Sequence, residues 1–124
     1  MSQWTDEELM AVADELLDEL PEDIKHGLEG VSILIQDLPA ADQARRVGLR
    51  QGASLLGLYE GVPLSRGSVF QSAVLPPAIY LFRGNIERTC RTPEELKERL
   101  RFTLFHEIGH HLGFTEEDLR KRGL

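Results

Sequence analysis

The N-terminal part of the chain has a helical pattern of hydrophobic positions. From Leu9 to Leu20 a hydrophobic residue recurs every three or four positions, with acidic residues between. Thr5 and Glu8 have the spacing of a capping box, so we expect an amphipathic helix that ends near Glu19. Pro21 and the two acids after it can open a second short helix, which the glycines that follow would end.

Two short segments are typical of β-strands. Val31–Gln36 and Ala78–Phe82 are rich in β-branched or aromatic residues and lie close to glycine or proline. Gly84 and Asn85 indicate a turn after the second strand.

The pattern between the two strands is weaker. Residues 40–50 fit either a polar helix or a loop, and residues 52–61 fit either a strand or a turn of helix. Residues 63–77 are rich in Gly, Ser and Pro and predict a long loop, and loops of that length in small domains are often functional.

The clearest helix start lies in the C-terminal third. Thr92 can cap a helix with proline at its first position and Glu95 at its third, and the helix is expected to run to about Leu112. Gly113 stands where a left-handed terminating residue belongs. A second capping pattern at residues 115–118 predicts a last short helix.

Length and charge narrow the class of protein. A chain of 124 residues suits one domain, residues 1–124, and the hydrophobic share of 41% is that of a globular protein. The net charge of −7 argues against binding to nucleic-acid phosphates. Residues 1–30 hold ten acids and one base, which fits a solvated helix face or an acidic docking surface.

Compartment signals indicate an intracellular protein. Cys90 is the single cysteine, so no intrachain disulfide can form. The first residues lack the basic and apolar regions of a signal peptide. The longest uncharged stretch, residues 67–82, has 16 residues and two prolines, fewer than the ~20 apolar residues of a membrane-spanning helix. We therefore expect a cytoplasmic location without membrane contact.

A metal-binding motif lies within the predicted long helix. His106, Glu107 and His110 form the pattern H-E-x-x-H. The two histidines are one helical turn apart, so both imidazoles can reach one metal ion, and Glu107 lies on the same side of the helix. The motif predicts one zinc ion per chain with Glu107 as its catalytic neighbour, although two histidines and a carboxylate also suit non-haem iron.

The residues after the motif extend it to H-E-x-x-H-x-x-G-x-x-E. Gly113 can turn the chain so that Glu116 folds back as a third ligand, which leaves the fourth position open to water, as in catalytic zinc sites. Glu117 and Asp118 are the rival third ligands. The printed sequence has 14 residues after His110 and no methionine in this region, so neither a distant third glutamate nor a Met-turn is expected.

These features together resemble the bacterial minimal zincin-like metallopeptidase family. The similarity is carried by the acidic first helix, both strand segments, the segment 55–64 and the terminal H-E-x-x-H-H-x-G helix. It implies an α+β fold in which a small mixed β-sheet packs on the motif helix, two motif histidines and an acidic residue that bind zinc, and peptidase activity. The family has Asp at the third-ligand position, where this chain has Glu116. The resemblance also suggests Ala78–Phe82 as the sheet edge that pairs with an extended peptide.

Two functions remain open on the sequence alone. The first is a zinc peptidase acting on peptides or unfolded proteins, with Glu107 as general base. The second is a catalytically silent zinc-binding interaction or regulatory module. Transition-state stabilisers could be Tyr59, Tyr80 or His111, and His111 also fits a supporting or surface role.

Two further residues have ordinary explanations. His26 fits an exposed or structural position. The Cys90 thiolate could be stabilised by the N-terminus of the long helix, but Cys90 lies 16 residues from His106, which disfavours a cysteine–histidine hydrolase.

Overall fold

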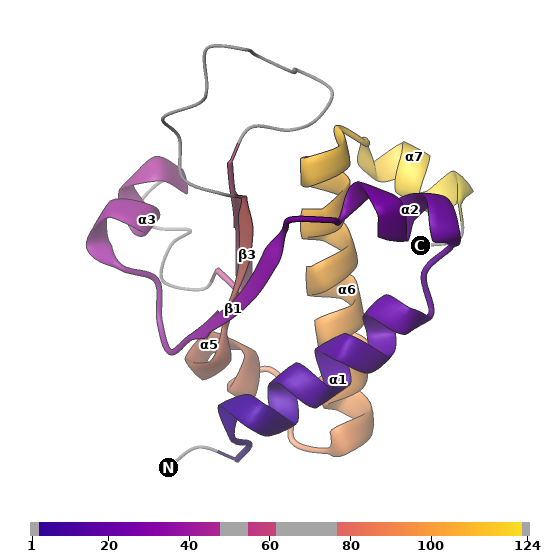
Figure 1. The fold of residues 1–124 in the computed structure, drawn as a ribbon. Helices are drawn as coiled ribbons and strands as arrows, with labels where there is room; N and C mark the ends of the chain where they lie inside the picture. Colours follow the sequence, from indigo (N-terminus) through magenta and orange to yellow (C-terminus); the bar gives the residue numbers. More distant parts are fainter. Residues whose placement is uncertain (1–2, 48–54, 62–76, 123–124) are drawn as a thin grey trace.

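The structure is a computed structural model that describes residues 3–47, 55–61 and 77–122, without the side chains at 46, 47 and 116. The mixture of helices and strands confirms the α+β prediction (Figure 1). In the described residues no helix is both long and apolar enough to cross a membrane. In chain order the elements are α1 (Asp6–Asp18), α2 (Glu22–Gly27), β1 (Ser32–Gln36), α3 (Ala41–Val47), β2 (Gly57–Glu60), β3 (Ala78–Phe82), α5 (Arg83–Glu87), α6 (Pro93–Leu112) and α7 (Glu116–Lys121).

The described strands form a mixed sheet in the order β1-β3-β2. β1 runs parallel to β3, with Ser32 opposite Ala78, and β2 runs antiparallel to β3, with Tyr59 opposite Ile79. The prediction that Ala78–Phe82 is a sheet edge is wrong, because β3 has a hydrogen-bonded neighbour on each side. Its apolar run is buried at four of five positions, which suits a central strand.

The hydrophobic core lies between α1, α6 and the sheet, with α1 crossing α6 (Figure 1). α6 contributes a buried residue every fourth position, so one side of the helix faces α1 and β3. α6 is 20 residues long, about 30 Å, and therefore carries both core residues and the motif residues on one helix. The core residues of these elements include Leu9 and Leu16 of α1, Ile79 and Leu81 of β3, and Leu96, Leu100, Leu104 and Ile108 of α6.

The predicted helix ends are confirmed. Gly113 ends α6 in the left-handed region with φ 78°, as its position after the last helical residue predicts. The three capping boxes expected from the sequence all form, Thr5 with Glu8, Thr92 with Glu95, and Thr115 with Asp118.

The ambiguous segments are resolved where the structure describes them. Residues 41–47 are a helix and residues 57–60 a strand, whereas the predicted loop lies outside the described residues except for Pro77. The turn predicted at Gly84 and Asn85 is wrong, since both belong to α5. The Gly84 amide donates to the Asp37 carbonyl at 2.8 Å, which holds the start of this helix against the end of β1.

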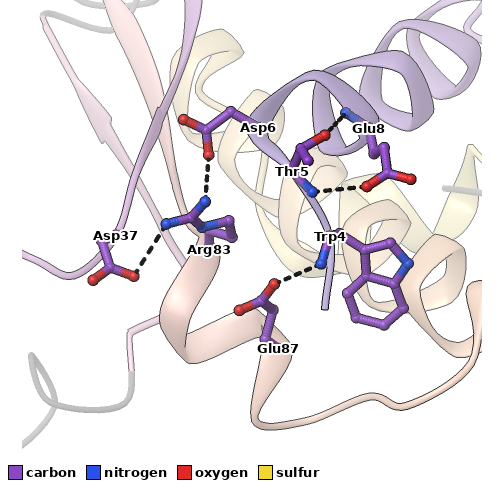
Figure 2. A network of polar contacts seen from close by, with 7 residues as sticks. All are labelled: Trp4, Thr5, Asp6, Glu8, Asp37, Arg83 and Glu87. Atoms are coloured by element: carbon purple, nitrogen blue, oxygen red, sulfur yellow. Dashed lines mark hydrogen bonds and ion pairs between the residues drawn. The ribbon is translucent and has the colours of Figure 1, made fainter. Parts of the chain in front are cut away.

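A polar network fixes the start of α1 (Figure 2). Arg83 places one guanidinium nitrogen 3.0 Å from Asp6 and another 3.7 Å from Asp37. The Trp4 amide donates to the Glu87 carboxylate at 3.0 Å. Together these contacts join the N-terminus of α1 to α5 and to the end of β1, so α1 is held across α6 at a defined angle.

Cys90 belongs to the core. The residue is 3% exposed, and its thiol donates to the Ile86 carbonyl at 3.3 Å. Burial raises the pKa of the Cys90 thiol. The thiolate considered from the sequence is therefore not supported, and Cys90 has a packing role.

Candidate metal centre

The three motif residues come together on the C-terminal half of α6. His106, Glu107 and His110 each offer a ligand atom, and these atoms lie within 4.8 Å of one another. The two imidazole rings meet edge to face with centroids 4.6 Å apart, and His110 Nδ1 lies 3.2 Å from Glu107 Oε1. The geometry confirms that the two imidazoles and the carboxylate share one side of the helix.

Burial differs among the three residues. His106 is half-buried, and the His110 side chain is 52% exposed, so both can be reached from solvent. Glu107 is only 6% exposed. A buried carboxylate is costly unless it is hydrogen-bonded or paired with a cation. Glu107 meets this need through the Tyr59 backbone amide, which donates to Glu107 Oε1 at 2.8 Å.

The amide of Tyr59 reaches Glu107 because β2 lies very close to α6. Gly57 makes this approach possible. A Cβ atom at Gly57 would lie 2.7 Å from Thr103 Cγ2 and 3.5 Å from Glu107 Cγ. The missing side chain thus lets the strand deliver a backbone donor to the carboxylate.

α7 also packs against the motif, at Gly109. A Cβ atom at Gly109, inside the motif, would lie 2.5 Å from Leu119 Cδ1, so α7 packs directly on the helix there. The Phe114 amide donates to the Gly109 carbonyl at 2.8 Å, and the left-handed Gly113 reverses the chain. These contacts place α7 beside the C-terminal end of α6 (Figure 1).

The candidate third ligands lie at the start of α7. The side chain of Glu116 lies outside the described residues, so its role stays a prediction. Glu117 pairs with Lys121 at 3.6 Å. The Asp118 carboxylate accepts the Thr115 amide at 2.9 Å, and this backbone hydrogen bond lowers the Asp118 pKa. Both rivals are thus engaged in contacts of their own.

The other histidine predictions have definite outcomes. His111 is 2% exposed, so the surface role considered for it is wrong. Its Nε2 lies 2.8 Å from the Gly27 carbonyl and must be the N–H donor, which joins α6 to the end of α2. His26 is exposed as predicted, and a hydrogen bond to Glu29 raises its pKa.

The two tyrosines considered as stabilisers lie on neighbouring strands. The Tyr59 ring packs at 5.1 Å from the His111 ring, and burial raises the pKa of the Tyr59 hydroxyl. The Tyr80 ring stacks on Phe82 at 6.4 Å. Tyr59 therefore acts on the site through its backbone amide, a role that the sequence pattern did not reveal.

The donor set fits a zinc ion. Imidazole nitrogens and carboxylate oxygens are the ligands that zinc takes in catalytic sites, and the motif brings two imidazoles and a carboxylate together. The buried carboxylate of Glu107 is hydrogen-bonded beside the two histidines, whereas a purely structural site does not require it.

Comparisons with known proteins agree with this geometry. A family model described as zincin-like metallopeptidase matches residues 28–124. A solved structure described as a conserved hypothetical protein from Thermo thermophilus is similar in fold, with a TM-score of 0.57 and 28% identity. That similarity covers 95% of this chain and 99% of the other. No curated protein is significantly similar to the chain.

Proposed function

Since the chain belongs to the zincin-like metallopeptidase family, we propose that it is a zinc-dependent peptidase with its active site at the C-terminal half of α6. The observation that carries the proposal is the buried carboxylate of Glu107, fixed by the Tyr59 amide next to His106 and His110. A metal site alone needs the two histidines, whereas a hydrolase also needs a base beside them.

The side chains have separate roles in this proposal. His106 and His110 hold zinc through their imidazole nitrogens. Bound zinc supplies a Lewis acid that polarises a peptide carbonyl and lowers the pKa of water. Glu107 takes the proton of the attacking water and passes it to the leaving amine. Glu107 Oε1 already accepts the Tyr59 amide and lies 3.2 Å from His110 Nδ1. We therefore propose that Glu107 Oε2 is the oxygen that takes the proton of the water.

We propose Glu116 as the third ligand. The support is indirect, since Glu117 is paired with Lys121 and Asp118 caps α7, whereas Glu116 begins the helix that packs on Gly109. Measuring bound zinc per chain at limiting free zinc tests the assignment. Glu116→Gln should lower zinc affinity by tenfold or more, since even the loss of a group that only supports a ligand costs about 10–100-fold. The neighbouring change Glu117→Gln is the matched control and should leave affinity unchanged.

The proposed substrates are peptides or unfolded protein segments, because the motif histidines lie on an accessible helix end. We also propose a cytoplasmic setting, which the buried free thiol of Cys90 suits. Neither nucleic acid nor membrane is part of the proposal, in keeping with the net charge of −7.

Cleavage of a diverse library of unstructured peptides, followed by mass spectrometry, tests the function. Zinc-loaded protein should cleave a subset of peptides, and a chelator should stop the reaction. Glu107→Gln keeps the shape and the acceptor for Tyr59 but removes the base, so we expect a loss of about 10²–10⁴-fold in rate. Glu94→Gln, an exposed change on the same helix, should have no effect.

Two outcomes would reject this proposal. Cleavage that survives Glu107→Gln would reject Glu107 as the base and, with it, the proposed active site. A folded protein that binds one zinc per chain and cleaves nothing in the library would favour the zinc-binding interaction or regulatory module instead.

A further inference from the structure

A cavity of about 440 Å³ adjoins the candidate metal centre along α6. His106 lines this cavity and also belongs to the metal-binding group. A molecule in the cavity would therefore contact His106, a residue of the motif. The volume falls in the range of about 300–1,000 Å³ that is typical of small-ligand pockets.

The apolar part of the cavity is made by both helices of the site. Phe102 and Phe105 of α6 and Leu119 of α7 line it. Phe102 is 63% exposed, the largest exposed fraction among the large hydrophobic side chains that the structure describes. Its ring lies nearly parallel to that of His106, with centroids 6.0 Å apart and an angle of 13°. A single exposed Phe is ordinary, but one stacked on a predicted metal ligand at a cavity offers a surface for an apolar group.

The charged part of the cavity is positive in a protein that is negative overall. Among the residues whose side chains the structure describes, Arg101, Arg120 and Glu98 line it, and their formal charges sum to +1 in a chain of net charge −7. Arg101 is already committed, because it pairs with Glu19 at 2.9 Å and with Glu98 at 3.8 Å and lies over the Phe105 ring. Arg120 of α7 is exposed at the other side of the cavity. A guanidinium in this position suits a carboxylate from the occupant.

We propose that this cavity is the specificity pocket of the enzyme and takes a large apolar peptide side chain flanked by an acidic residue. The inference rests on the proposed peptidase function. Phe102, Phe105 and Leu119 receive the apolar group, and Arg120 pairs with the neighbouring carboxylate. Gly109 has a part in specificity as well, since its missing side chain lets α7 bring Leu119 and Arg120 to this position.

Binding of defined peptides to the zinc-loaded Glu107→Gln protein tests the pocket without turnover. The probes are three blocked hexapeptides with glycine at the other four positions, carrying Phe-Glu, Phe-Gln or Ala-Glu at the centre. Calorimetric titration should give the tightest binding for Phe-Glu and at least about tenfold weaker binding for Ala-Glu, because the apolar group is lost.

Further substitutions in the Glu107→Gln protein test the charged part and the apolar part of the pocket separately. Arg120→Glu should weaken binding of the Phe-Glu peptide about tenfold and that of the Phe-Gln peptide less than twofold. The adjacent Lys121→Glu makes the same charge change on the same helix outside the cavity and should alter neither. Phe102→Ala should weaken both Phe peptides, and its melting temperature checks that this exposed change leaves the fold intact.

The pocket is refuted if Lys121→Glu weakens binding as much as Arg120→Glu, if the three peptides bind equally, or if none binds. Its failure is distinct from failure of the proposed function. Cleavage that depends on Glu107 but is insensitive to changes at Phe102 and Arg120 leaves the peptidase and removes the pocket. Pocket-dependent binding without any cleavage by the wild-type protein retains the pocket as a peptide site and removes the peptidase.

Discussion

Gly57→Ala is the sharpest test of how the fold builds the site. The backbone of Gly57 is outside the left-handed region, so alanine can adopt it, and the effect is purely steric. The new Cβ would lie 2.7 Å from Thr103 Cγ2 and 3.1 Å from the Tyr80 carbonyl oxygen. Both contacts are shorter than van der Waals distance, so one of the groups in contact must shift. We expect β2 to move away from α6 and to carry the Tyr59 amide away from Glu107.

Three contributions set the change in the free energy of unfolding that we expect for Gly57→Ala. Overpacking of this kind costs about 1–3 kcal/mol. A weakened hydrogen bond to the Glu107 carboxylate adds at most about 1.5–3 kcal/mol. The lower entropy of alanine in the unfolded chain offsets about 0.4–1 kcal/mol. The three contributions together span a net loss of roughly 0–5 kcal/mol, and we expect a value near the centre, about 2–3 kcal/mol, which for a domain of this length lowers the melting temperature by about 8–12 °C.

Thr103 provides the control. Thr103→Ser removes Cγ2, the atom in closest contact, and keeps the hydroxyl. Urea denaturation of the wild type, both single variants and the double variant gives a thermodynamic cycle. The double variant should recover at least half of the stability lost in Gly57→Ala. Additive effects of the two changes would refute the steric explanation, as would a Gly57→Ala protein as stable as the wild type.

Three further outcomes are expected. His111→Ala should lower the free energy of unfolding by about 2–4 kcal/mol in urea, since it leaves a cavity and an unpaired Gly27 carbonyl; unchanged stability would contradict the role of this contact. Hydrogen bonds from the Arg91 and Thr92 amides lower the pKa of Glu95, so the stability that Glu95 contributes is present above its unfolded pKa near 4.5 and is lost as the pH falls through its lower folded pKa. Glu95→Gln should therefore reduce the change of melting temperature between about pH 5 and 3. An identical dependence of melting temperature on pH in both proteins would refute this. Zinc at about 100 times its dissociation constant should stabilise the wild type by about 2.7 kcal/mol in thermal denaturation, and His110→Ala should abolish most of this gain; equal stabilisation of both proteins would place the ion elsewhere.

The secondary structure around the site could be predicted from local sequence because its signals are local. The Thr92 cap, the periodic leucines and Gly113 each act within a few residues, and the structure reproduces them. The short helix α5 was missed because its start depends on a hydrogen bond from Gly84 to Asp37, distant in the chain. The position of β3 at the centre of the sheet likewise depends on pairing partners that lie 46 residues away, Ser32 with Ala78.

The motif helix and the grouping of His106, Glu107 and His110 on one side of it could be predicted from local spacing, because the helical repeat sets those positions. The α+β class was implied by the family resemblance, and the structure confirms it. The surroundings of these three residues depend on how the chain folds in three dimensions. The Tyr59 amide on Glu107, the buried role of His111 and the cavity shared by Phe102 and α7 arise where segments distant in the chain meet. Such contacts produce no periodic pattern in the sequence. They depend on glycines, which have no side chain, and on backbone groups that packing brings close together.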